Sequence, residues 1–377
     1  MGAYGNGHEV SPVNGWMNAR SILVQSAPVA VIFLTCASAS AAPRVVDLDG
    51  LRSRHVDIAA GVRLADAGAV IAATIERRGA LRAAVVRLRH DGTVVEGFGR
   101  GGVTLAGPRG ATALAVTSDA RGRRIVVAVR GPHGRLRLIG VDAHGRRRSG
   151  FGRHGARVLG PAEPTALAAR GVRVAVAHGS SLALLDARSG KTLAATTAQG
   201  CLTPRTAQLA GDRLIVAGDA ASCRPAIDVY DAATLAPAGG APVDGARALA
   251  LELPGERTLC VAEQDGSQVR ARRADPARLL DGDPFAGAPA LGATDRLTAL
   301  APDPRGGCNL LLARPASGGR VVQTERGGDV AIVTTLPQRF RPRVVFVCRR
   351  HVLAAGVRRS GGRLVGALAV VERHGHG

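Results

Sequence analysis

Residues 113–129 of the chain read ALAVTSDARGRRIVVAV, which is a short apolar phrase, a polar turn and a strand rich in valine and alanine. The same order of phrase, turn and strand recurs along the chain. Clear copies occupy residues 166–177, 207–218, 248–262 and 299–313, and looser copies occupy residues 57–72 and 344–356. Short alternating apolar runs that are separated by turn residues are typical of β-hairpins. The sequence therefore predicts a chain of repeated hairpins.

The spacing of these seven copies predicts the architecture. They extend over about 330 residues at intervals of roughly 41 to 55, the period of four-stranded propeller blades. One four-stranded sheet alone would leave two apolar faces in water, whereas radial packing of several sheets buries both faces. We predict an all-β protein, a β-propeller with seven four-stranded blades. Two stacked β-sandwiches are the alternative.

A lone predicted strand, residues 44–48 (RVVDL), precedes the first copy, and the last copy ends near His374 with three strands. We expect the N-terminal strand to complete the last blade and close the ring, because closure removes open sheet edges. Residues 42–377 would then form a single propeller domain, which we expect to be a monomer. Aromatic residues make up 2% of the chain, so its core must consist of small aliphatic side chains.

The first 41 residues have the order of a secretory signal. Met17 and Arg20 precede an apolar stretch over residues 22–37, and Ala39-Ser40-Ala41 is a small-residue cleavage site. We predict a signal peptide over residues 1–41, with Met17 as a candidate start, and a bacterial-type extracytoplasmic location, secreted or in the envelope. A membrane anchor is the alternative, but a span needs about 20 apolar residues. We expect no membrane span after cleavage.

Cleavage would leave five cysteines in an oxidising compartment, where some of them should pair. Cys201 and Cys223 flank one predicted strand unit and are the disulfide that we expect. The odd number leaves at least one thiol free. The pairing of the other three, Cys260, Cys308 and Cys348, stays open.

Two segments in the first half repeat more closely, residues 91–103 (DGTVVEGFGRGGV) and residues 144–156 (HGRRRSGFGRHGA). This pattern resembles the delta-60 repeat of bacterial exported propeller-like proteins, over roughly residues 65–160. The matching positions are Gly92, Phe98, Gly99 and Gly102 in the first segment, and Gly145, Phe151, Gly152 and Gly155 in the second. We interpret these glycines as turn residues and the two phenylalanines as apolar plugs between blades.

The match to this family is incomplete. Val95 and Arg148 stand where the family usually has an acidic residue, and Gly97 and Gly150 replace its serine. The other copies have drifted further from the pattern. The resemblance therefore implies an exported propeller-like protein, without assigning a ligand.

The net charge of +21 could indicate nucleic acid as a partner. Arginines supply almost all of it, however, and they are dispersed along the chain. Proteins that bind single strands usually interleave aromatic side chains for base stacking, which this chain lacks. We expect a solvated basic surface and no nucleic acid partner.

The chain has neither G-x-S-x-G nor H-E-x-x-H, so we predict no catalytic, cofactor or metal residues. The pairs Asp47/Asp49 and Asp281/Asp283 offer only two carboxylates each for calcium. The hypothesis is an exported binding or interaction protein with an anionic envelope polymer or another exported protein as its partner. The alternatives are an enzyme that acts on a sugar or lactone at the channel mouth, and an envelope scaffold.

Overall fold

A computed structural model gives the fold of the compact unit Ser40–Gly377. The structure describes residues 43–161, 165–198, 202–219, 227–241, 247–252, 259–281, 284–285, 288–292, 295–314, 318–325, 328–348 and 351–372. In these residues every element except one short 3-10 helix is a β-strand. None of the described helices is long and apolar enough to cross a membrane.

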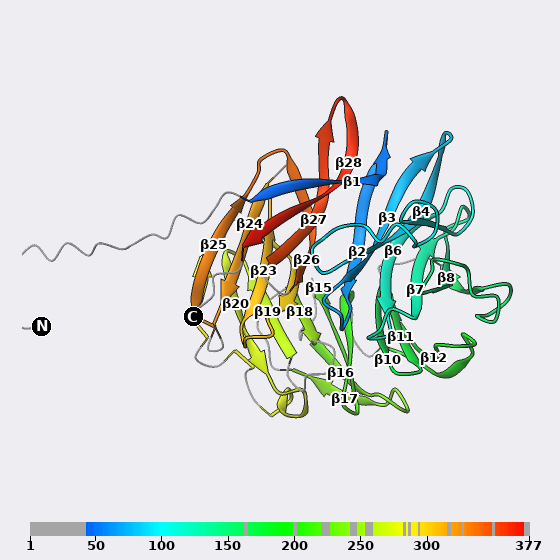
Figure 1. Ribbon diagram of the computed structural model, residues 1–377. Helices are drawn as coiled ribbons and strands as arrows, with labels where there is room; N and C mark the ends of the chain where they lie inside the picture. Colours follow the sequence, from blue (N-terminus) through cyan, green and yellow to red (C-terminus); the bar gives the residue numbers. More distant parts are fainter. Residues whose placement is uncertain are drawn as a thin grey trace, which may run out of the picture. The chain divides into compact units, whose positions relative to one another are not determined.

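The first three sheets each contain four antiparallel strands in chain order (Figure 1). The first consists of β2 (Val56–Arg63), β3 (Ala69–Arg77), β4 (Ala80–Leu88) and β5 (Val103–Ala106). The second consists of β6 (Thr112–Ser118), β7 (Arg124–Arg130), β8 (Arg135–Asp142) and β9 (Ala156–Pro161). The third consists of β10 (Thr165–Arg170), β11 (Arg173–His178), β12 (Ser181–Asp186) and β13 (Thr192–Thr197).

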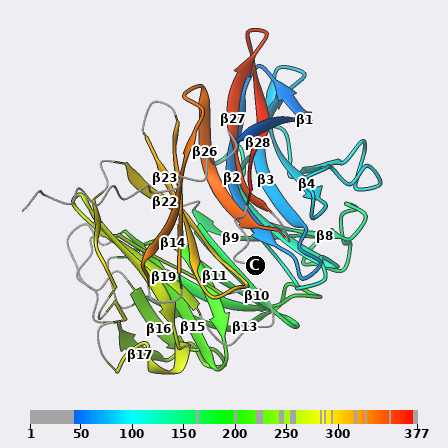
Figure 2. The same cartoon turned by 60° about the vertical axis from the view of Figure 1, so that its left-hand side comes forward.

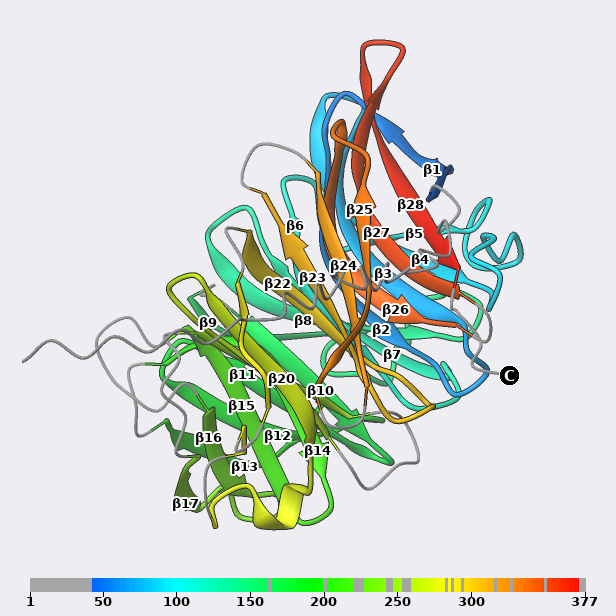
Figure 3. The same ribbon diagram turned by 90° about the vertical axis from the view of Figure 1, so that its left-hand side faces the viewer.

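The next eight strands form two such units that share one pairing, Asp219 with Arg247. The fourth unit consists of β14 (Thr203–Ala210), β15 (Arg213–Asp219), β16 (Ile227–Asp231) and β17 (Pro237–Gly240). The fifth consists of β18 (Arg247–Glu252), β19 (Leu259–Asp265), β20 (Gln268–Ala274) and β21 (Leu291–Gly292). The 3-10 helix η1 (Pro276–Arg278) follows β20 and is the short coiled ribbon in Figure 3.

The last of the two remaining sheets contains both the first and the last strand of the described residues. One consists of β22 (Arg296–Pro302), β23 (Cys308–Ala313), β24 (Gly319–Thr324) and β25 (Val330–Leu336). The other consists of β26 (Phe340–Val347), β27 (His351–Ser360), β28 (Arg363–Glu372) and the N-terminal strand β1 (Arg44–Ser53). β1 pairs antiparallel with β28, for example through Val46 and Leu368.

The core lies between neighbouring sheets, and the alternation of side chains along each strand explains it. In β11, Val174 and Val176 belong to a cluster shared with the second sheet, whereas Ala175 and Ala177 belong to a cluster shared with the fourth. Successive residues of a strand point to opposite faces, so a strand between two sheets is apolar at nearly every position. This is why the repeated phrases contain runs of alanine and valine.

The innermost strands β2, β6, β10, β14, β18, β22 and β26 each contact the next one in the chain, and β26 also contacts β2. β2 and β26 lie side by side in Figure 2. A cluster that includes Ile58 of β2 and Phe346 of β26 joins the first and last sheets. Small side chains permit this approach, since a Cβ at Gly61 would lie 2.2 Å from the Phe346 ring.

Candidate functional site

The innermost strands enclose a cavity of about 780 Å³. Residues of all seven innermost strands line it, and most of them are alanine, valine, leucine or threonine. Six lining residues are charged: Asp57 and the arginines Arg63, Arg130, Arg170, Arg205 and Arg343. A cavity with an excess of one sign of charge and low-polarity walls concentrates ligands of the opposite sign.

A β-bulge interrupts five of the seven innermost strands close to their first residues. In each of these strands the pairing with the second strand skips one residue, whereas the described pairings of β10 and β18 run without a shift. The skipped residues are Ala59, Leu114, Arg205, Thr298 and Arg343, and all five line the cavity. Because bulges redirect side chains, these five residues, the bulge ring, define one mouth of the cavity.

The two arginines of the bulge ring form ion pairs at this mouth. Arg205 contacts Asp219 of β15 at 2.8 Å, and Arg343 contacts Asp57 of β2 at 3.7 Å. Asp219 also contacts Arg247 at 2.7 Å and Arg296 at 3.6 Å. One carboxylate therefore faces three guanidinium groups from β14, β18 and β22, so the cluster carries excess positive charge.

Two further acidic side chains near this end of the strands are buried and already paired. Asp295 accepts hydrogen bonds from Arg314 Nε at 3.0 Å and from Arg320 Nε at 3.1 Å. Glu263 forms an ion pair with Arg270. A buried carboxylate needs such partners, because an unpaired buried charge is costly. These two groups stabilise their sheets, and the described residues contain no cluster of three metal-ligating side chains.

The repeat-motif residues lie at the other end of the strands. Gly92 and Gly145 have φ angles of +85° and +77°, and Gly102 and Gly155 have φ angles of +79° and +78°. Positive φ angles of this size favour glycine. None of these four glycines lines the cavity.

The two Phe-Gly pairs make equivalent contacts with the next sheet. Phe98 is buried in the cluster between the first and second sheets, and Phe151 in the cluster between the second and third. The N–H of Gly99 donates to the carbonyl of His144, and the N–H of Gly152 donates to the carbonyl of Ser189, both at 2.7 Å. The motif thus joins the first sheet to the second and the second sheet to the third.

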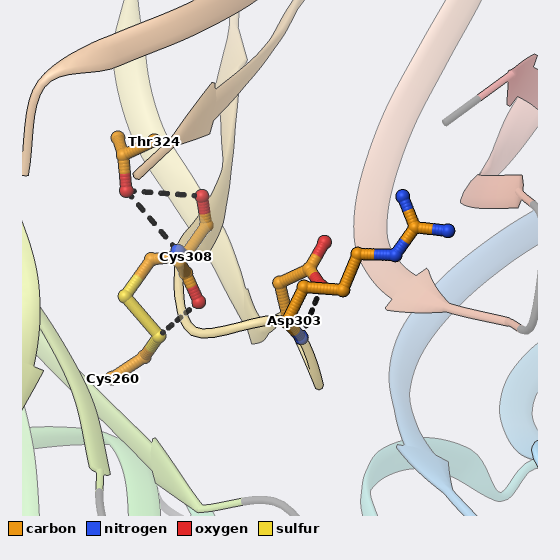
Figure 4. The surroundings of a disulfide bond; sticks show 6 residues. Cys260, Asp303, Cys308 and Thr324 are labelled. Carbon is orange, nitrogen blue, oxygen red and sulfur yellow. Dashed lines mark hydrogen bonds between the residues drawn. A yellow bond between two sulfur atoms is a disulfide. The ribbon is translucent and has the colours of Figure 1, made fainter. Parts of the chain in front are cut away.

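A disulfide joins Cys260 of β19 to Cys308 of β23, and Figure 4 shows its surroundings. The bond links two sheets, and Thr324 Oγ1 accepts a hydrogen bond from the N–H of Cys308 at 3.1 Å. The sequence had left this pairing open. The disulfide expected from the sequence, Cys201 with Cys223, lies outside the described residues. Cys348 is a free, buried cysteine, and burial raises the pKa of its thiol to about 11.

Comparisons with known proteins identify the fold. No family model matches the chain, and no curated protein matches it. Among solved structures, the β-propeller domain of Cps50 (Swd1) from Myceliophteria thermophila is 13% identical, with a TM-score of 0.57 over 87% of this chain and 100% of that chain. The WD40 β-propeller domain of Doa1 is 12% identical, with a TM-score of 0.53 over 84% and 96%.

A chain of the mitotic checkpoint complex is similar to the same degree, with 13% identity and a TM-score of 0.57 over 88% of this chain and 95% of that chain. These similarities, together with the sheets described above, define the class: the protein is an all-β protein with a β-propeller fold. At these identities the similarity concerns the fold alone.

Proposed function

We propose that the chain is an exported β-propeller of seven blades that binds an acidic segment of another exported protein at the bulge ring. Seven innermost strands line one cavity, and the pairing of β1 with β28 supports a ring closed by the N-terminal strand. The two delta-60-like segments and the order of residues 1–41 support export, with cleavage after Ala41. The disulfide between Cys260 and Cys308 suits an oxidising compartment.

The observation that carries the binding proposal is the placement of Arg205 and Arg343 in the bulge ring. Both arginines are skipped in the pairing of their strand with the next, and both line the cavity. A guanidinium group binds a carboxylate through two parallel hydrogen bonds, which matches aspartate and glutamate side chains.

The hypothesis of an enzyme that acts on a sugar or lactone requires a carboxylate or histidine that exchanges protons with the substrate. At this mouth the carboxylates of Asp57, Asp219 and Asp295 each form ion pairs with arginine. Each of these carboxylates therefore already has a cationic partner within the protein. This arrangement favours the recognition of an anion over proton transfer.

The experiment measures the affinity of a fluorescent hexaglutamate peptide for the protein and for the double variant Arg205→Gln/Arg343→Gln. We expect the double variant to bind about tenfold more weakly, because each lost charged contact costs a fraction of a kcal/mol or more. The matched control is Arg77→Gln/Arg135→Gln, which removes two exposed arginines from outer hairpin turns. Equal affinities of the wild type and the bulge-ring variant would refute the proposal.

A further inference from the structure

We infer that the turns of the first three sheets form a second binding surface, for an anionic polysaccharide. The surface consists of the turns between the first and second strands and between the third and fourth strands of these sheets. They comprise residues 64–68, 89–102, 119–123, 143–155, 171–172 and 187–191. This surface, the basic turn surface, lies at the end of the strands opposite the bulge ring and does not depend on the function proposed above.

Backbone hydrogen bonds make these turns one continuous surface. The N–H of Ala65 donates to the carbonyl of Ala120, which joins the first and second sheets. The N–H of Ala187 donates to the carbonyl of Val172 within the third sheet, and the Gly152 to Ser189 bond joins the second sheet to the third. Each of these bonds measures 2.7 Å. The cationic side chains therefore stand on a connected and ordered backbone.

Charge is segregated between the two halves of this end of the protein. The basic turn surface carries ten arginine or lysine residues and four acidic residues. The corresponding turns of the fourth, fifth and sixth units, in the part that the structure describes, carry two arginines and six acidic residues. A uniform excess of arginine along the chain would have made both halves basic. The difference creates a directed field, positive over the first three sheets.

The exposed side chains of the surface indicate which polyanion fits. Arg121, Arg123, Arg146 and Arg153 are all exposed. The two phenylalanines of these turns, Phe98 and Phe151, are fully buried, so only the histidine rings of the turns are exposed for stacking on a nucleic acid base. Val172 is the one large apolar side chain of the surface that is strongly exposed, which offers little area for insertion into a membrane. Repeated carboxylates without bases, as in a polyuronate, match this chemistry.

Hydrogen bonds to acidic side chains also hold the backbone of these turns, and a preorganised backbone lowers the entropic cost of binding. Asp186 accepts hydrogen bonds from the N–H of Ser189 at 2.7 Å and from that of Arg188 at 3.1 Å. Asp142 likewise accepts from the N–H of Arg146 at 2.8 Å. The acidic side chains of this end thus hold the backbone that presents the arginines. Many weak and ordered contacts along one chain give a combined affinity that each contact alone would not.

The test measures binding of the full chain to immobilised polygalacturonate, with neutral dextran as the control polymer. The variant Arg121→Glu/Arg123→Glu/Arg146→Glu/Arg153→Glu reverses four exposed charges that make no side-chain hydrogen bond or ion pair with described residues. We expect an affinity at least about tenfold lower for this variant. We also expect a steep loss of wild-type binding when the salt concentration rises from about 0.05 M to about 0.3 M.

The matched control reverses four exposed arginines on the hairpin turns at the bulge-ring end, Arg77, Arg135, Arg359 and Arg363, to glutamate. It makes the same change in net charge, and we expect it to retain at least half of the wild-type affinity. Arg205→Gln/Arg343→Gln should bind polygalacturonate as the wild type does, which separates this inference from the proposed function. Equal losses in both quadruple variants would refute a focused surface. Stronger binding to a single-stranded oligonucleotide or to anionic vesicles than to polygalacturonate would refute the choice of polymer.

Discussion

The backbone N–H of Gly152 donates a hydrogen bond of 2.7 Å to the carbonyl of Ser189, across the boundary between the second and third sheets. Gly99 makes the same bond to His144 one sheet earlier. In both places the glycine follows a buried phenylalanine and has a positive φ angle, +59° at Gly152 and +65° at Gly99. The buried phenylalanine and the glycine that donates the hydrogen bond to the next sheet are therefore adjacent residues of one motif.

We predict that Gly152→Ala destabilises the protein by roughly 1–3 kcal/mol, the usual cost of a strained backbone conformation. An added Cβ would lie 2.2 Å from the carbonyl oxygen of Ala156, so the loop must move and weaken the bond to Ser189. The control is Gly150→Ala, where a Cβ would meet no atom within 4 Å. Urea denaturation measures both variants, and a Gly152→Ala midpoint equal to that of Gly150→Ala would contradict the prediction.

The periodic phrases predicted the β-propeller class and the innermost strands because burial between two sheets imposes an apolar run on each strand. Residues 113–129 cover most of β6 and β7, and residues 166–177 cover most of β10 and β11. The comparison with solved propellers confirms the class of fold. The delta-60 resemblance and the signal peptide stay predictions.

The bulge ring could not be predicted, since a skipped pairing leaves no mark on composition. Arg205 lies in the segment TPRTAQLA of β14, and no residue of this segment marks it as the one that the pairing skips. The basic turn surface was hidden for a different reason. Its arginines are dispersed in the sequence, and only the packing of three sheets collects their turns at one end.

The disulfide between Cys260 and Cys308 is a further feature that was not predicted from the sequence. Cys260 and Cys308 are 48 residues apart, and each lies at the start of the second strand of its sheet, in consecutive sheets. Equivalent positions in consecutive repeats are the signal that could have indicated this pair. Proximity along the chain, which suggested Cys201 and Cys223, cannot reveal contacts between sheets.

The hydrogen bonds of Asp186 lead to a prediction about how the stability of the protein depends on pH. Hydrogen bonds from the N–H and hydroxyl of Ser189 lower the pKa of this carboxyl below its ordinary value of 3.8. A carboxyl whose pKa is lower in the folded state stabilises the fold at pH values above its ordinary pKa. This contribution is lost as the pH falls through the pKa of the folded state. We expect Asp186→Ala to cost roughly 1 kcal/mol at pH 7, as for the loss of a capping side chain.

The measurement is urea denaturation of wild type and Asp186→Ala at neutral pH and at the lowest pH where both still fold. The difference between them should shrink in acid, since the wild-type carboxyl becomes protonated and its bonds weaken. Asp212→Ala is the control, because this side chain is 84% exposed and, among the described residues, forms an ion pair only with Arg213, at 3.6 Å. A difference that stays constant with pH would show that the charge of Asp186 does not contribute.

Removal of the disulfide should destabilise the protein. It closes a loop with a sequence separation of 48, and the loss of such a crosslink costs about 2–4 kcal/mol. We expect the variant Cys260→Ala/Cys308→Ala to unfold at lower urea concentration than the wild type. In a strong reductant the wild type should approach the variant, and identical midpoints in oxidising buffer would contradict the prediction.

Asp219 contributes both to the stability of the protein and to the charge of the proposed site. We expect Asp219→Asn to lower the stability and to raise the affinity for hexaglutamate. Arg247, whose side chain is 11% exposed, would lose its anionic partner, which we expect to cost about 1–3 kcal/mol. The bulge ring would gain one unit of positive charge near Arg205, so hexaglutamate should bind more tightly and associate faster at low salt. Asp212→Asn removes one exposed acidic charge elsewhere and should change neither property. If Asp219→Asn weakened hexaglutamate binding in a fully folded protein, Asp219 would be positioning Arg205 for the ligand, and it would not be competing with that ligand for the arginine.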